Sequence, residues 1–242
     1  MMTVRAEIRK LLTIRTPLIL FAAAQLLVVA GISGVLARRD DIAAAAIQRD
    51  AVAHAGLVSI LTLVLGITAV AGEYRHRTIS DTYLTTPDRA RVVVAKLGVY
   101  SVVGLVFGVA AAATALISAA LWLSGRGASL ATGSGELWRT VGGGIIWNAL
   151  FCAIGVGVGA LITNLMGAVA AALAWLALVE GVVAALVGDG ADWLPFALGS
   201  ALDALPTATD GPPQWLAGVA LAGYAAVFAV AAVLTTVRRD VT

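Results

Sequence analysis

Residues 72–96 read GEYRHRTISDTYLTTPDRARVVVAK, and a long apolar run lies on each side of them. The segment holds five of the sixteen Lys and Arg residues of the chain. The flanking runs cover residues 52–71 and 98–123, and a bilayer core requires about 20 apolar residues per helix. The sequence therefore predicts two membrane spans joined by residues 72–96, which we call the charged loop.

The same kind of run recurs along the whole chain. Hydrophobic residues make up 60% of the sequence, charged residues only 12%, and the mean hydropathy is +0.96, values that exclude a soluble globular domain. The runs are too long and too uniform for barrel strands, and lipid otherwise allows only helices. We expect an all-α membrane protein with six transmembrane helices, forming a single transmembrane domain over residues 1–242. The spans are expected at roughly 17–36, 52–71, 98–123, 141–163, 166–187 and 215–237.

The distribution of Lys and Arg predicts the orientation, because these residues concentrate in cytoplasmic loops. With a cytoplasmic N-terminus, eleven of them fall on the cytoplasmic side and five outside, where the loops are also rich in acids. Both termini and the charged loop are then cytoplasmic. We expect a multi-pass protein of the plasma membrane, in a bacterial cell.

The N-terminus carries an amphipathic pattern before the first span. Val4, Ile8, Leu11 and Leu12 share one helical stripe within residues 3–15, and the basic residues Arg5, Arg9 and Lys10 lie off this stripe. This is typical of a helix that lies in the headgroup plane, although a simple positive anchor fits equally well. The first span resembles a signal peptide at its basic start, but its apolar core exceeds the usual length of about 7 to 15 residues, so we expect it to be retained.

The charged loop divides at Thr86-Pro87-Asp88. Thr is a frequent N-cap, Pro is favoured at the first helical position, and an acid suits the positive end of a helix dipole. The third span is thus expected to begin in the cytoplasm. Residues 74–85 mix apolar and charged side chains and favour a short amphipathic helix that docks on a partner, although a solvated loop whose arginines only set topology would also explain the charges. The candidate docking residues are Glu73, Tyr74, Arg75, His76, Arg77, Thr78, Asp81, Tyr83, Arg89 and Arg91.

This order of elements resembles the ABC type-2 transporter permeases, the membrane subunits of ATP-binding cassette exporters. The start of the loop matches in Gly72, Glu73, Tyr74, Arg75 and Thr78. Its end matches in Thr86, Pro87, Arg89, Arg91 and Lys96, and Asp88 departs from the usual pattern. The resemblance implies a coupling helix in this loop that fits a cleft on a separate ATP-binding subunit. It also implies two such subunits, which bind ATP and Mg, and a second permease as homodimer or heterodimer.

The chain lacks a phosphate-binding loop of its own, which requires a Lys followed by Ser or Thr. Its two lysines, Lys10 and Lys96, are each followed by Leu. We therefore expect no catalytic residues, metal ligands or cofactor in this chain, and an ATPase in its partner. The basic residues flank membrane segments rather than form a patch with aromatics, so nucleic-acid binding is not expected.

Polar residues inside the apolar runs are costly and often mark pathways. Glu180 and Asn148 are the candidates for a substrate pathway, although Glu180 is also compatible with a buried structural acid, and Asn148, Asn164 and Gln25 with interhelical hydrogen bonds. We expect an exporter subunit that moves a hydrophobic or amphipathic substrate, such as a drug, antibiotic, lipid or peptide. The alternatives are a proton-coupled secondary transporter using Glu180 and an intramembrane hydrolase, for which no nucleophile with a base appears.

Two further patterns concern packing. The pairs Gly104/Gly108 and Gly155/Gly159 have the spacing that lets helix backbones approach closely, within the subunit or at a dimer seam. Residues 188–214 contain prolines, aspartates and an apolar series, and favour one or two short helices on the outer edge of the membrane.

Overall fold

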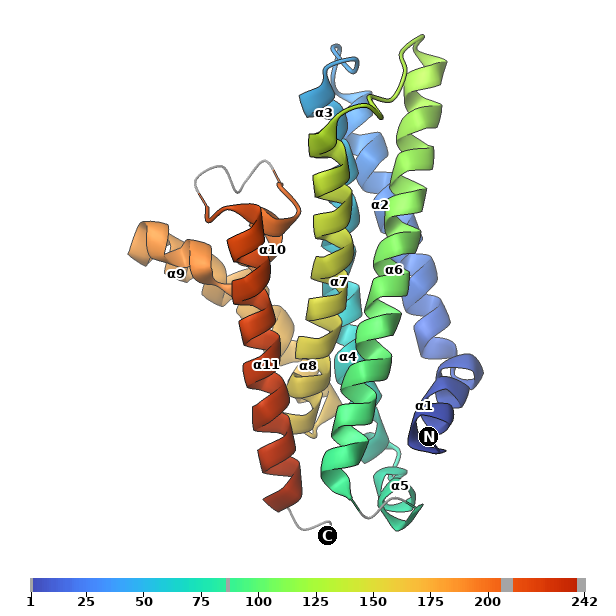
Figure 1. The fold of residues 1–242 in the computed structure, drawn as a ribbon, viewed down its shortest axis with the longest axis vertical. Coiled ribbons are helices and arrows are strands. Elements are labelled where there is room, and N and C mark those ends of the chain that lie inside the picture. The colour runs from blue at the N-terminus through green and yellow to red at the C-terminus, as the bar shows by residue number, and fades with distance from the viewer. Residues whose placement is uncertain (1, 86–87, 206–210, 239–242) are drawn as a thin grey trace.

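The computed structural model describes residues 2–85, 88–205 and 211–238, and these residues form helices connected by short loops (Figure 1). Six of the helical segments are long and apolar enough to cross a membrane: Arg15–Ala37, Ala45–Arg75, Arg89–Gly125, Gly135–Leu161, Leu165–Val187 and Gln214–Thr236. No strand occurs within the described ranges. The prediction of an all-α chain with six such helices is confirmed, and its composition and hydropathy indicate a multi-pass membrane protein.

Several spans consist of more than one element. The first is α2 (Arg15–Ala37), preceded by α1 (Met2–Thr13). The second combines α3 (Ala45–Val52), the 3₁₀ turn η1 (Ala53–Val58) and α4 (Ser59–Arg75). The short α5 (Ile79–Thr85) follows, and the third and fourth spans are α6 (Arg89–Gly125) and α7 (Gly135–Leu161).

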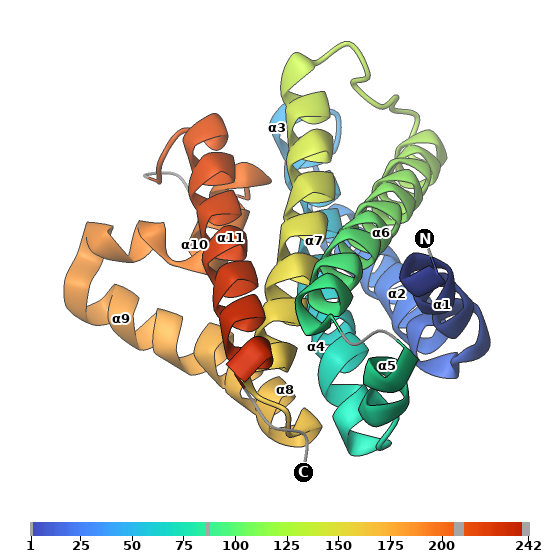
Figure 2. The same ribbon diagram turned by 60° about the horizontal axis from the view of Figure 1, so that its bottom comes forward.

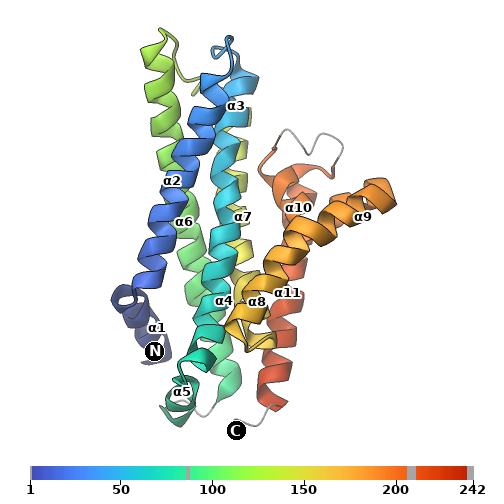
Figure 3. The same ribbon diagram turned by 180° about the vertical axis from the view of Figure 1, so that it is seen from behind.

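The fifth span is interrupted. It runs as α8 (Leu165–Ala174), a π turn η2 (Trp175–Val179) and α9 (Glu180–Val187), and Figure 3 shows α9 projecting obliquely from the bundle. The short elements η3 (Gly188–Trp193) and α10 (Pro195–Leu202) then lead back toward the last span, α11 (Gln214–Arg238). Short helices between the last two spans were predicted for residues 188–214, and the described part of this segment contains η3 and α10.

The core lies around α4 and α7, which pack against each other and are the most buried of the spans. Glycines make this contact close. A Cβ atom on Gly155 would lie 2.1 Å from the carbonyl oxygen of Leu63, and one on Gly66 would lie 2.1 Å from that of Cys152. Gly159 meets Ile67, and Gly104 and Gly108 meet α7. These glycines therefore serve packing within the subunit, one of the two roles considered for them.

The two ends of the bundle differ. Figure 2 brings forward the end that carries α1, α5 and the C-terminal end of α11, which we call the α5 end, and shows α1 beside α2 and α6. The opposite end carries α3 and the connection between α6 and α7. There Gln48 is buried, donates to the carbonyl oxygens of Ile42 and Ser129, and accepts from the backbone N–H of Ala131. These bonds fix α3, which extends the second span seven residues beyond its expected start at residue 52.

Candidate functional site

Residues 72–75 of the charged loop form the last turn of α4, and a specific backbone motif ends this helix. The N–H of Thr78 donates to the carbonyl of Glu73 over 3.0 Å, and the N–H of Arg77 donates to that of Tyr74 over 3.2 Å. This pair of bonds is the Schellman motif, which places the residue after the C-cap in the left-handed region and favours glycine there. The sequence has Arg77 instead, with a φ of 57°. The turn therefore holds a basic side chain in a backbone conformation that costs free energy.

The predicted docking residues divide by exposure. The side chains from Arg75 to Thr78 are exposed at the α5 end, Arg91 is exposed, and Tyr74 and Arg89 are partly buried. Asp81 and Tyr83 belong to α5, but their side chains lie outside what the structure describes. Leu84 on α5 is 81% exposed, whereas Ile79 is buried. An accessible surface with basic and apolar side chains therefore occupies the end of the bundle; we call residues 75–78 the basic turn.

Glu73 differs from these exposed residues, because its side chain is buried and faces the bundle. It belongs to a buried charge network formed by Glu7, Lys10, Glu73 and Lys96. The ammonium of Lys96 lies 2.8 Å from Oε2 of Glu7 and 2.7 Å from Oε1 of Glu73, and donates to the carbonyl of Ala69 over 3.0 Å. Lys10 lies 2.5 Å from Glu73 and 3.0 Å from Glu7.

The network contains two acids and two bases, so its formal charges cancel. Lys96 and Glu7 are almost completely buried, and charges so placed are stable only when paired and hydrogen-bonded. Partial burial of Lys10 lowers its pKa, but the hydrogen bond and charge of Glu73, together with Glu7, outweigh this, so the pKa of Lys10 is raised. Lys10 is therefore held as a cation, and the network joins α1, α4 and α6 beneath the basic turn.

The start of α6 also differs from the expectation. The N-cap is Asp88, whose carboxylate accepts from the N–H of Arg91 over 3.1 Å, and the helix begins at Arg89. The predicted N-cap Thr86 and first-turn residue Pro87 lie outside the described residues. The departure from the family pattern at Asp88 thus supplies the cap of the third span, because a carboxylate is a good acceptor at a helix N-terminus.

Glu180 and Asn148 are not brought together. Glu180 is buried where α9 begins, and its carboxylate accepts from the N–H groups of Phe196 and Ala197 in the first turn of α10 and from Trp175 Nε1. Asn148 is fully buried on α7 and donates to the carbonyls of Gly144 and, over 3.4 Å, Ala55. Both therefore link helices in this structure.

The other intramembrane amides fall into two groups. Gln25 accepts from Thr114 over 2.6 Å and thus joins α2 to α6, as predicted. Asn164, which was also considered for such bonds, caps α8 by accepting from the N–H of Gly167 over 2.9 Å. Among the side chains that the structure describes, no group of three or more His, Cys, Asp or Glu residues is arranged to hold a metal ion.

The pairing of Glu7 with Lys96 does not follow from the sequence. A signal existed, because Glu7 is the only acid in a basic amphipathic segment and Lys96 precedes a long apolar run. Such residues require partners, but the sequence does not say which ones.

No protein-family model and no curated protein matches the chain. The resemblance to ABC type-2 permeases therefore depends on the residues of the charged loop and on the order of the spans.

Proposed function

We propose that the chain is the membrane-spanning subunit of an ATP-driven exporter and moves a hydrophobic or amphipathic substrate outward. In this proposal the α5 end is cytoplasmic and a separate ATP-binding subunit, which holds ATP and Mg, docks on the basic turn and α5. Two permease chains and two ATP-binding subunits complete the transporter in the plasma membrane of a bacterial cell.

One observation carries the proposal: the exposed basic turn lies directly next to the buried charge network. Glu73, in the last turn of α4, contacts Lys96 on α6 and Lys10 on α1. A partner that displaces the turn would therefore move α4, α6 and α1 together, because separating buried charges is costly. The partner in turn finds exposed cations and an apolar residue, Leu84, at the same end. This combination provides both a docking surface and a mechanical connection to the spans.

The proposal is tested by reversing one charge at each end of the bundle. Arg75→Glu changes an exposed residue of the basic turn, and Arg139→Glu changes an exposed residue at the start of α7, on the opposite end. We expect the first variant to reduce affinity for the co-purified ATP-binding subunit about tenfold, because charges at an interface control recognition of the partner. The second should leave the affinity unchanged.

Both variants should insert and purify like the unmodified chain, since both positions are exposed. A full complement of ATP-binding subunit on the Arg75→Glu variant, together with normal transport, would show that the docking assignment is wrong. Equal losses at both ends would show that the effect concerns net charge and not the basic turn.

A further inference from the structure

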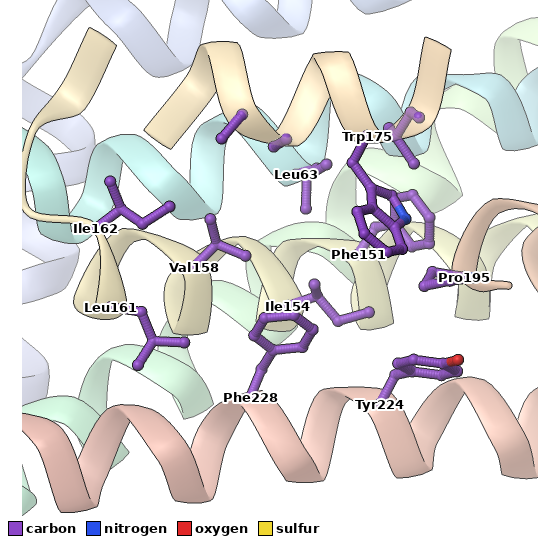
Figure 4. A pocket seen from close by; sticks show the side chains of 13 residues that line it. Leu63, Phe151, Ile154, Val158, Leu161, Ile162, Trp175, Pro195, Tyr224 and Phe228 are labelled. Carbon is purple, nitrogen blue, oxygen red and sulfur yellow. The ribbon is translucent and has the colours of Figure 1, made fainter. Parts of the chain in front are cut away.

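An apolar cavity of about 330 Å³ lies beside the interrupted fifth span (Figure 4). Phe228 and Tyr224 project into it from α11 toward Ile154 on α7, and Trp175 closes one side. Its walls come from α4, α7, α8, η2, α10 and α11. Ile162 and Trp175 are also exposed at the surface of the bundle. The cavity can therefore hold an apolar group between the spans.

A second cavity of about 330 Å³ adjoins the first and has a different chemistry. Leu176 lines both cavities, and the consecutive residues Pro195 and Phe196 line one each. The ring of Trp175 lines the apolar cavity while its Nε1 donates to Glu180, which lines the second cavity. The second cavity also includes Asp192 and Ser200. The π turn thus stands where an apolar space meets an acidic one, and such turns are frequent at functional sites.

The charges of the second cavity lack basic counterparts nearby in the sequence. Residues 140–237, which form most of both cavities, contain no Lys, Arg or His but five Asp and Glu residues. The carboxylate of Glu180 already accepts three N–H groups. Asp192 is partly exposed, and within the part of the chain that the structure describes its carboxylate has no hydrogen-bond or ion-pair partner. An uncompensated carboxylate in a cavity favours a cation.

We propose that the two cavities form one binding site for an amphipathic cation, whose apolar part occupies the first cavity and whose cationic head lies near Asp192. The role of this site in transport rests on the proposed exporter function, whereas binding of the amphipathic cation does not require the partner ATPase. Charge complementarity selects this occupant over a neutral lipid chain, and the largely apolar first cavity supplies the affinity, because burial of apolar surface is the main driving force.

Trp175 provides the measurement, since it lines the apolar cavity. The purified full-length chain in lipid nanodiscs is titrated with a trimethylammonium amphiphile whose undecyl chain carries a terminal bromine, which quenches tryptophan on contact. We expect quenching that saturates on top of the linear background from the lipid, and loss of the saturable part in Trp175→Phe. A purely linear response would overturn the proposal.

A substitution that fills the apolar cavity is compared with a matched substitution outside it. Ala172 lines the apolar cavity, whereas Ala170, two residues earlier on α8, is exposed and not part of its lining. Ala172→Phe should weaken binding at least tenfold, and Ala170→Phe should leave it unchanged. Equal effects of the two variants would overturn the assignment of this cavity.

The head group is tested with a pair of probes. Asp192→Asn should weaken binding of the trimethylammonium probe about threefold to fivefold, the range for a partly exposed ion pair, and should not alter binding of the corresponding bromoundecanol. Glu136→Gln, which removes an exposed acid in the first turn of α7, should affect neither probe. An identical response of both probes to Asp192→Asn would overturn the selection for a cation.

The outcomes separate this inference from the exporter proposal. If the ATP-binding subunit fails to bind the basic turn but the probe still saturates, the site stands and the proposed motor does not. If docking holds and the quenching is linear, the exporter proposal stands and this site does not.

Discussion

The ammonium of Lys96 lies 2.8 Å from Oε2 of Glu7, although 89 residues separate them in the chain. The contact ties α1 to the third span from inside the bundle. The apolar residues Val4, Ile8 and Leu12 of α1 are at the same time exposed. The N-terminal helix therefore presents an apolar stripe outward while one acid anchors it to the buried charge network.

Removing one member of this network leaves an unbalanced buried charge. We expect Lys96→Met to lower the free energy of unfolding by about 3–5 kcal/mol, as for other broken buried ion pairs. The double variant Glu7→Gln/Lys96→Met should cost less than the sum of the two single changes, because Glu73 and Lys10 remain paired. Cys152 is the only cysteine and is fully buried, so its reaction with a thiol-reactive fluorophore during heating reports unfolding.

The control for this prediction is Arg49→Met. Arg49 pairs with Glu136 over 3.2 Å at the opposite end, where the Glu136 side chain is 72% exposed. An exposed pair contributes at most about 1 kcal/mol. Similar losses for Lys96→Met and Arg49→Met would contradict the importance of burial.

The basic turn predicts an unusual stabilising substitution. Arg77→Gly should raise the free energy of unfolding by about 1 kcal/mol, because glycine adopts the left-handed conformation of this position without strain. Arg75→Gly is the matched control, since it also removes one positive charge near the C-terminus of α4. Arg75 is the last residue of α4 and has no positive φ, so glycine relieves no strain there and costs up to about 1 kcal/mol. Thermal unfolding followed by circular dichroism should shift in opposite directions for the two variants, and a shared downward shift would show that Arg77 is not strained.

The local features of the fold followed from the sequence, because hydropathy reports burial in lipid directly. The run expected at 17–36 corresponds to Arg15–Ala37, and the run at 215–237 to Gln214–Thr236. The start of the second span was missed because Arg49 and Asp50 interrupt the apolar pattern, while the structure continues the helix by burying Gln48 among backbone groups.

The candidate site was predictable only in part. Exposure of the basic turn followed from its charge, but the burial of Glu73 did not, because its partners come from two distant helices. Likewise, Glu180 stood out as an acid in an apolar run, but its bonds to the first turn of α10 depend on how residues 188–195 fold back. Pair contacts between distant segments are tertiary information that composition and periodicity do not contain.

We expect the stability of the protein to depend on pH through the carboxyl group of Asp203. Asp203 lies outside the spans, at the end of α10, and is fully buried against Gly56 and Gly144. This burial raises the pKa of its carboxyl well above the usual value, although a backbone hydrogen bond from Gly56 opposes the shift. A raised pKa in the folded state means that folding favours the protonated form. Stability from this group is complete below the usual carboxyl pKa and is lost as the pH rises toward the raised value, by up to about 1.4 kcal/mol per pH unit.

Asp203→Asn should remove this dependence and make the protein more stable at neutral pH than the unmodified chain. The measurement is thermal unfolding at about pH 5 and about pH 8, compared between the two proteins. Asp50→Asn, which changes a partly exposed acid beside Arg49, should retain the original dependence. An unchanged pH dependence in Asp203→Asn would show that other groups cause it.

Glu180 separates the exporter from the proton-coupled secondary transporter. Its carboxylate accepts from the N–H groups of Phe196 and Ala197, so Glu180→Ala should leave two partly buried donors without this acceptor and cost about 1–3 kcal/mol. Glu180→Gln keeps one carbonyl acceptor and should cost less. In vesicles that contain the chain and its ATP-binding subunit, ATP-driven transport should survive in Glu180→Gln, because a structural acid needs only to accept these bonds. If instead a pH gradient alone drives transport by the isolated chain and Glu180→Gln abolishes it, the carboxyl carries protons and the exporter proposal is wrong.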